Sequence, residues 1–162
     1  MDIELLFSRN PFVQEVSGQF SIIRPNESVE MRLPANRSSA TIDLPAAYRD
    51  RNVMIEVTGG GVTRRQAHYP HTLGIRLMET YGQLRITEAG ARRPLPAVYV
   101  KVYARMKGGQ VVFYKDGYTD LRGRFDYTSL NTNELEQVER FAILIMSEGN
   151  GAVIREAAPP KM

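Results

Sequence analysis

Cysteine and tryptophan are absent from this chain of 162 residues, and histidine occurs only twice. Without cysteine there is no disulfide framework, no thiolate zinc site and no cysteine nucleophile. His68 and His71 are therefore the only candidates for an imidazole base or an imidazole metal ligand. These absences remove many catalytic and metal-binding classes before any motif is considered.

A long apolar run is missing as well. Residues 1–7 carry acidic side chains where a secretory signal needs positive charge. No stretch of about 18 apolar residues follows them, so we expect no membrane insertion. If the protein is secreted, its signal lies upstream, and the chain is then a fragment of something longer.

The chain carries only a slight excess of positive over negative side chains. Twenty-one Lys and Arg stand against 18 Asp and Glu, which gives a net charge of +3. The basic excess is spread along the chain in pairs such as Arg64-Arg65 and Arg92-Arg93. A phosphate-binding footprint is usually clustered on one face, so this distribution argues against nucleic acid. Hydrophobic residues make up 43% of the chain, which indicates a packed core.

Alternation of apolar and polar residues with a period of two predicts an all-β protein. No stretch keeps a helical apolar stripe beyond two turns. Turn signals separate the expected strands, at Pro25, Pro34, Pro45, Pro70 and the run Gly59-Gly60-Gly61. One helical turn is expected within residues 43–49. The strands expected in the first half are 12–23, 28–33, 39–44, 53–58, 62–69 and 73–79. Their number and spacing predict an immunoglobulin-like sandwich over residues 1–79.

The second half, residues 80–162, predicts a second antiparallel β-sandwich joined to the first with almost no linker. Gly108-Gly109 and Asp116-Gly117 are expected as hairpin turns because such turns need positive φ. Residues 140–146 are apolar on both faces, which marks a central strand. Residues 130–138 are expected as a short helix or an inserted loop. The other expected strands are 83–87, 98–106, 110–115, 123–127 and 152–155.

Three segments of this half, 82–87, 94–102 and 118–127, resemble the carboxypeptidase-regulatory-like family of transthyretin-type and Cna-B-type sandwiches. Their most specific motif is the Thr-Asp-x-x-Gly-x-Phe turn at residues 119–125. In it, Asp120 can accept from backbone amides two residues on, Gly123 relieves a tight turn and Phe125 fills the core.

The resemblance implies a non-catalytic accessory domain without a cofactor, in an extracytoplasmic protein that is secreted or displayed at the cell surface. Cna-B relatives form isopeptide bonds from lysine to asparagine. The first strand here offers Gln83 and Arg85 but no lysine, so no such bond is expected.

The strand at 98–106 carries the sharpest candidate binding surface. Its valines point to one side, and its tyrosines and basic residues point to the other. Such a face suits a protein partner or stacking on sugar rings. The alternative is that it packs on the first domain, with Lys and Arg stems covering the tyrosine rings. The candidate binding residues are Tyr99, Lys101, Tyr103, Arg105, Tyr114 and Tyr127.

Metal and catalytic chemistry have weaker support. His68 and His71 lie three apart with Pro70 between them, and two ligands do not make a site. Three carboxylates at Asp116, Asp120 and Asp126 do not follow the alternate spacing of an EF-hand, and no glutamate closes the loop. We therefore predict no metal site and no catalytic residue.

The leading hypothesis is a non-catalytic interaction or scaffold module, the C-terminal region of a larger multidomain protein. Its expected partner is another protein or a neighbouring domain of the same chain. A carbohydrate-binding module is the alternative, and it would show exposed coplanar tyrosines. A metal-dependent enzyme using His68 and His71 is the second alternative, and it needs carboxylates from distant strands.

Overall fold

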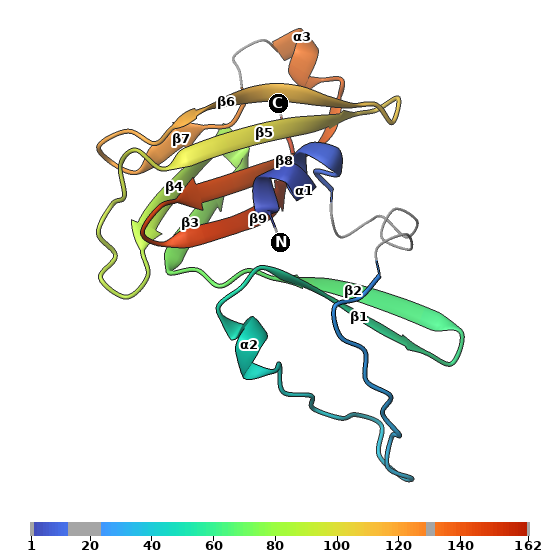
Figure 1. Cartoon of the computed structure of the whole chain (residues 1–162). Helices are drawn as coiled ribbons and strands as arrows, with labels where there is room; N and C mark the ends of the chain where they lie inside the picture. The colour runs from blue at the N-terminus through green and yellow to red at the C-terminus, as the bar shows by residue number, and fades with distance from the viewer. Residues whose placement is uncertain (1, 13–23, 129–131, 162) are drawn as a thin grey trace.

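The computed structural model describes residues 2–12, 24–128 and 132–161. Every strand pair in it is antiparallel, which confirms the all-β fold class. No helix among the described residues is long and apolar enough to cross a membrane. The elements, labelled in Figure 1, are α1 (Ile3–Arg9), α2 (Ala46–Arg49), β1 (Val53–Gly59), β2 (Val62–His68), β3 (Leu73–Met78), η2 (Glu79–Tyr81), β4 (Gln83–Glu88), β5 (Tyr99–Met106), β6 (Val111–Tyr118), β7 (Arg124–Asp126), α3 (Thr132–Leu135), β8 (Val138–Ser147) and β9 (Gly151–Ala157).

Strands β3 to β9 form one sandwich of two sheets, ordered β3-β4-β7 and β6-β5-β8-β9. Figure 1 shows the first sheet as a layer behind the second. Counted from β3, the first, second and fifth strands share one sheet, as they do in an immunoglobulin constant domain. The fourth strand, β6, differs from that arrangement because it pairs with the third strand, β5.

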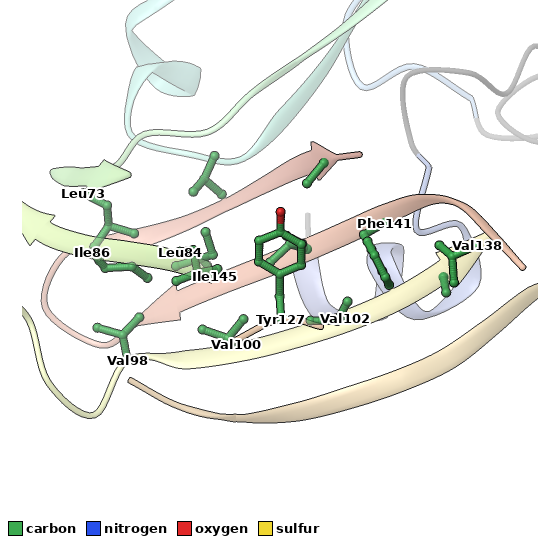
Figure 2. Packing of buried hydrophobic residues seen from close by; sticks show 14 residues of the cluster. Leu73, Leu84, Ile86, Val98, Val100, Val102, Tyr127, Val138, Phe141 and Ile145 are labelled. Carbon is green, nitrogen blue, oxygen red and sulfur yellow. The ribbon is translucent and has the colours of Figure 1, made fainter. Parts of the chain in front are cut away.

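The core lies between these two sheets, as Figure 2 shows. Alternate residues of β4 and β5 face into it, and the central strand β8 is buried on both faces, as its sequence predicts. Each fully buried Val, Leu, Ile or Phe side chain contributes about 1.5–3 kcal/mol. The fully buried large side chains of this core are Tyr127, Phe141, Leu84, Ile86, Ile143, Ile145, Val100, Val102, Val138 and Val153.

A second apolar cluster lies on the outer face of the four-stranded sheet, where α1 docks. The Asp2 carboxylate accepts from the amides of Glu4 and Leu5 and so caps the N-terminus of α1. Ile3 and Phe7, one helical turn apart, are buried against the sheet. This helix is not predicted from the sequence, because two apolar positions in a seven-residue segment give little periodicity.

The turn at residues 119–125 has the expected geometry. The Asp120 carboxylate accepts from the amides of Arg122 and Arg124, at 2.8 and 2.9 Å. Gly123 has a φ of 70°, and a Cβ there would lie 2.2 Å from the carbonyl oxygen of Ile86. Phe125 packs against the core. This motif therefore shapes the fold.

Asp116-Gly117 is not a hairpin turn, so that prediction is wrong. Both residues lie within β6, which runs unbroken from Val111 to Tyr118. A Cβ on Gly117 would lie 2.9 Å from the Phe125 ring, so the glycine is needed for close packing and not for positive φ. The Gly108-Gly109 turn is confirmed, with Gly109 at a φ of 86°.

The first half departs further from expectation. The strands predicted at 28–33 and 39–44 are not formed, and that at 12–23 lies almost wholly outside the described residues. The predicted strands at 53–58 and 62–69 and the helical turn are present as β1, β2 and α2. The domain boundary between residues 79 and 80 stays a prediction. Strands β3 and β4 lie on either side of this boundary and pair with each other in one sheet.

Candidate interaction surface

The candidate face of β5 is the side opposite the core. Val100, Val102 and Ala104 point inward and are fully buried. Tyr99, Lys101, Tyr103 and Arg105 alternate with them and are half-buried on the other side. Their partial burial has an identifiable cause, because the N-terminal segment of the chain lies over this face (Figure 1).

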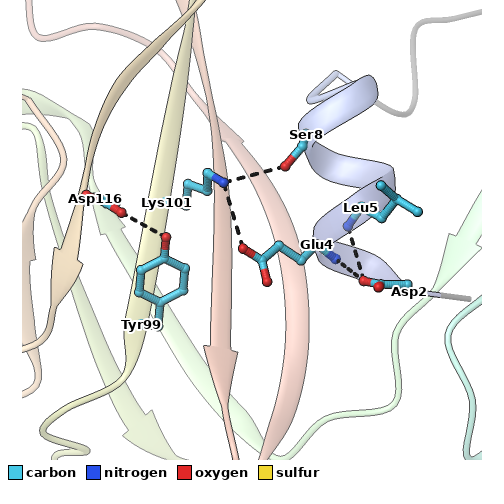
Figure 3. Close-up of polar contacts among 7 residues, drawn as sticks. All are labelled: Asp2, Glu4, Leu5, Ser8, Tyr99, Lys101 and Asp116. Carbon is cyan, nitrogen blue, oxygen red and sulfur yellow. Dashed lines mark hydrogen bonds and ion pairs between the residues drawn. The ribbon is translucent and has the colours of Figure 1, made fainter.

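Helix α1 and the residues after it hold three of the four side chains. The Phe7 ring meets the Tyr103 ring edge to face, with centroids 5.4 Å apart. Figure 3 shows the Lys101 Nζ atom reaching the Glu4 carboxylate at 3.8 Å and the Ser8 hydroxyl at 3.5 Å.

Arg105 is held at the other end of the same face. Its guanidinium carbon lies 4.6 Å from the centroid of the Phe12 ring, and its Nε atom donates to the Glu139 carboxylate at 3.2 Å. The face is thus a docking site for the chain's own residues 2–12.

Tyr99 lies beyond α1, at the end of the face. Its hydroxyl donates to the Asp116 carboxylate at 2.9 Å, a contact drawn in Figure 3. Desolvation and this carboxylate raise the pKa of Tyr99 to about 12. The rings of Tyr99 and Tyr118 are 5.5 Å apart and inclined by 52°, so they do not form a coplanar platform.

A cleft of about 650 Å³ opens beside Tyr99 and Tyr118. Asp50 and Asn52, which follow α2, form one wall, and the turn between β8 and β9 contributes Glu148. The charged side chains described in its lining are the carboxylates of Asp50 and Glu148.

Tyr114 and Tyr127 are not brought to this face. Both rings pack against Phe141 on the core side of the sheet, with centroid distances of 5.0 and 5.6 Å. Tyr127 is fully buried, and burial raises its pKa to about 12. Both tyrosines therefore contribute to packing between the sheets.

The histidines and carboxylates do not converge. His68 Nε2 lies 2.9 Å from the carbonyl oxygen of Arg49, whereas His71 Nδ1 accepts from the Leu73 amide at 3.1 Å. Desolvation lowers the pKa of His71, and the nearby charge of Arg155 lowers it further. Among the described residues, no group of three or more His, Asp or Glu side chains could hold a metal ion.

The residues that cover the face are not among those predicted from the sequence. The signal for α1 was present in Asp2 as an N-cap residue followed by Ile3 and Phe7 four apart. Nothing in the sequence links that segment to β5, because the contact joins distant parts of the chain.

Two protein-family models match the chain. The one described as the AbpF C-terminal domain matches residues 72–162, and the one described as the AbpF seventh immunoglobulin-like domain matches residues 1–55. The curated Actin-binding protein F of Dictyostelium discoideum is 38% identical over 160 residues, which is 99% of this chain and 7% of that relative. No solved structure matches the chain.

These matches support two immunoglobulin-like domains in tandem within a larger protein. They support an immunoglobulin-like sandwich for the second half without supporting the transthyretin-like subtype. The expected extracytoplasmic location is contradicted, because the relative that matches 99% of this chain is described as an actin-binding protein.

Proposed function

Because the chain belongs to the family of AbpF C-terminal domains, we propose that it contributes to actin binding as a non-catalytic interaction module of a larger protein. The observation that carries the proposal is the 38% identity to Actin-binding protein F over 99% of the chain. The similarity includes both the sandwich and the N-terminal region, so the relative contains the whole of this two-part unit.

The packing of α1 on β5 supports a scaffold role within that unit. Phe7, Tyr103 and Lys101 join the region that matches the seventh domain to the region that matches the C-terminal domain. The Tyr99 to Arg105 face accordingly serves as an internal joint that holds residues 2–12 against the sandwich. A transthyretin-like subtype stays a proposal whose support is the turn at residues 119–125.

The alternatives have less support. A carbohydrate platform would use coplanar exposed rings, and the Tyr99 and Tyr118 rings are steeply inclined to one another. A metal-dependent enzyme would need acidic residues beside the histidines, and His68 and His71 contact backbone groups. Neither alternative accounts for the family match.

Co-sedimentation with actin filaments tests the proposal. The chain should pellet with filaments in a saturable manner and should stay in the supernatant when filaments are omitted. A fluorescently labelled chain added to filaments gives an independent reading through its anisotropy. If the folded chain stays in the supernatant at every filament concentration, actin binding does not reside in this region.

The joint is tested separately with Lys101→Ala and Tyr103→Ala, each compared with Tyr118→Ala. The first two changes should release α1, seen as faster hydrogen exchange of its amides, because they remove contacts to Glu4 and Phe7. Tyr118 is exposed and lies beyond α1, so its removal should leave that exchange unchanged. Equal effects from all three variants would contradict the joint.

A further inference from the structure

Three arginines stand side by side on the three-stranded sheet. Arg76 of β3 is directly opposite Arg85 of β4, and Arg85 is directly opposite Arg124 of β7. Directly opposite residues in an antiparallel pair point to the same face, with Cβ atoms about 4.5–5.5 Å apart. These residues, here called the arginine row, cross the full width of the sheet.

The arginine row lies on the outer face of the sandwich. Its strand neighbours Ile75, Leu84, Ile86 and Phe125 belong to the core between the sheets or pack against it, so the arginines, which alternate with them, face the other way. Helix α1 packs on the opposite side of the sandwich, against the four-stranded sheet (Figure 1). The row is therefore remote from the joint described above.

Several arginines elsewhere in the chain have carboxylate partners. Ion pairs join Arg65 to Glu56, Arg93 to Glu88, Arg105 to Glu139 and Arg140 to Glu156. Among the described residues, no ion pair or side-chain hydrogen bond is formed by Arg76, Arg85 or Arg124.

The two nearest carboxylates in sequence are already engaged. Asp126, on the same face, accepts from the Gln83 side chain at 2.7 Å. Asp120 accepts from the backbone amide of Arg124, and this bond is the main cause that lowers the pKa of Asp120. The buried Nε–H of Arg85 also has no acceptor among the described residues. Three positive charges thus face outward, while Asp126 is bonded to Gln83 and Asp120 attracts Arg124 of the row at one end only.

This arrangement works against folding. Like charges placed directly opposite each other destabilise a sheet, and a buried donor without an acceptor destabilises it further. A sheet that served packing alone would place threonine, aromatic or oppositely charged pairs at these positions. The row is therefore better explained by a ligand that supplies the missing negative charge.

We propose that the arginine row is a docking surface for an acidic helical segment of a protein partner. Carboxylates three or four residues apart on a helix have Cβ atoms about 5–6 Å apart, which matches the spacing of the row. Arginine forms paired hydrogen bonds with carboxylates, so each such side chain can meet one guanidinium. The inference rests on the proposed role as a protein interaction module, and it does not require that the partner be actin.

Other anionic partners fit the row less well. Lipid-binding clusters usually contain about 4–8 basic residues, and nucleic-acid surfaces often neutralise about 6–10 phosphates. The row has three arginines, and Asp126 on the same face would repel a uniformly anionic surface. An acidic helix can place an uncharged residue beside Asp126, whereas a membrane or a duplex cannot.

The test uses the full chain and a synthetic helical peptide with glutamates at i, i+4 and i+8, labelled for fluorescence anisotropy. The same peptide with glutamine at those positions is the probe control. The chain should bind the glutamate peptide, more weakly as salt is raised, and should not bind the glutamine peptide. Replacing all three arginines, Arg76→Gln, Arg85→Gln and Arg124→Gln, should weaken binding at least about tenfold.

The matched control replaces Arg24, Arg37 and Arg92 with glutamine, which changes the net charge equally at exposed positions outside the row. It should leave peptide binding within about twofold of the unchanged chain, since screening weakens distant charges. Equal losses in both triple variants would show general charge attraction and would overturn the proposal. Row-dependent binding to phosphatidylserine vesicles or to duplex DNA, without binding to the glutamate peptide, would also overturn it.

Thermal unfolding of Arg85→Gln separates a binding role from a structural one. Because the substitution removes like-charge repulsion, the midpoint should stay unchanged or rise while peptide binding falls. A marked fall in the midpoint would mean that the fold needs Arg85, and this would overturn the explanation of the row by a ligand.

Co-sedimentation of the row variant with actin filaments separates this inference from the proposed function. If the unchanged chain fails to pellet but binds the glutamate peptide through the row, the actin proposal fails and the row stands. If both the unchanged chain and the row variant pellet equally, and neither binds the peptide, actin binding stands and the row fails.

Discussion

Thr119 illustrates how one hydroxyl holds two segments together. It is a buried polar residue whose Oγ1 accepts from the Val98 amide at 3.0 Å and donates to the Leu95 carbonyl at 2.7 Å. Two backbone hydrogen bonds join the same segments: the Ala97 amide donates to the Thr119 carbonyl, and the Thr119 amide donates to the Val98 carbonyl. The hydroxyl satisfies two groups that would otherwise be buried without partners.

Replacement of Thr119 by valine should therefore destabilise the protein by about 1–3 kcal/mol, because the shape is kept and both hydrogen bonds are lost. Serine keeps the hydroxyl, so Thr119→Ser should cost clearly less. Urea unfolding followed by tyrosine fluorescence or circular dichroism measures both. A valine variant as stable as the serine variant would show that the two hydrogen bonds contribute nothing net.

His71 should make the stability depend on pH. Its pKa is lowered in the folded protein, first by desolvation and then by Arg155. Between that lowered value and the unfolded value of about 6.5, the unfolded state binds more protons, so the free energy of unfolding rises with pH. The stability that neutral His71 contributes is therefore fully present above a pH of about 6.5, and it is lost as the pH falls toward the lowered pKa of the folded protein.

Urea unfolding at pH 7.5 and pH 5.5 tests this prediction. The loss of stability at pH 5.5 should be smaller in His71→Asn, which can still accept from the Leu73 amide but does not titrate. It should also be smaller in Arg155→Gln, since removing the nearby positive charge lets the His71 pKa return toward its ordinary value. A loss of the same size in all three proteins would exclude His71 as its source.

At the scale of elements, α1 depends on its contact with the sheet for its existence. An isolated helix of seven residues is unstable in water. Phe7 is fully buried on the sheet, whereas Leu5 on the same helix is exposed. Phe7→Ala should therefore weaken docking of α1 by about 3–5 kcal/mol, and Leu5→Ala should change it by less than about 0.5 kcal/mol.

Hydrogen exchange of the α1 amides measures that docking directly. In Phe7→Ala their protection should fall while that of β4 changes little, because β4 lies in the core between the sheets and contributes no residue to the α1 cluster. If Phe7→Ala and Leu5→Ala have the same effect, α1 is not held by Phe7.

The elements also show what the sequence could predict. Apolar patterns and turn signals located β4, β5, β8 and β9, because buried strands must place alternate or successive residues in a core. The hairpin turn predicted at Asp116-Gly117 is wrong, since a glycine required for close packing looks the same in sequence as a glycine required for positive φ. The strands expected at 28–33 and 39–44 alternate well, yet their apolar side chains at Val29, Leu33 and Ile42 are exposed.

The candidate site was predictable only in part. Alternation placed Tyr99 to Arg105 on one side of β5 correctly, because side-chain direction follows from strand geometry. The sequence could not show that α1 covers this side, or that Tyr114 and Tyr127 turn inward. The arginine row was equally hidden, since Arg76, Arg85 and Arg124 become neighbours only through strand register.

For the molecule as a whole, stability should be distributed unevenly. The core lies between β3-β4-β7 and β6-β5-β8-β9, whereas β1 and β2 pair only with each other. Most residues of β1 are exposed, including Ile55 and Val57. A two-stranded hairpin is marginally stable alone, so β1 and β2 should open without unfolding of the sandwich.

Hydrogen exchange over the whole chain should therefore give two levels of protection. Amides of β5 and β8 should exchange only by global unfolding, which for a domain of this kind requires about 5–15 kcal/mol. Amides of β1 and β2 should exchange through local opening that requires only about 1–2 kcal/mol. Ile145→Ala in the core should lower the protection of β5 and β8 together, and Ile55→Ala in the hairpin should leave it unchanged. Protection of β1 equal to that of β8 would mean that the hairpin and the sandwich unfold as one cooperative unit, and the uneven distribution would then be excluded.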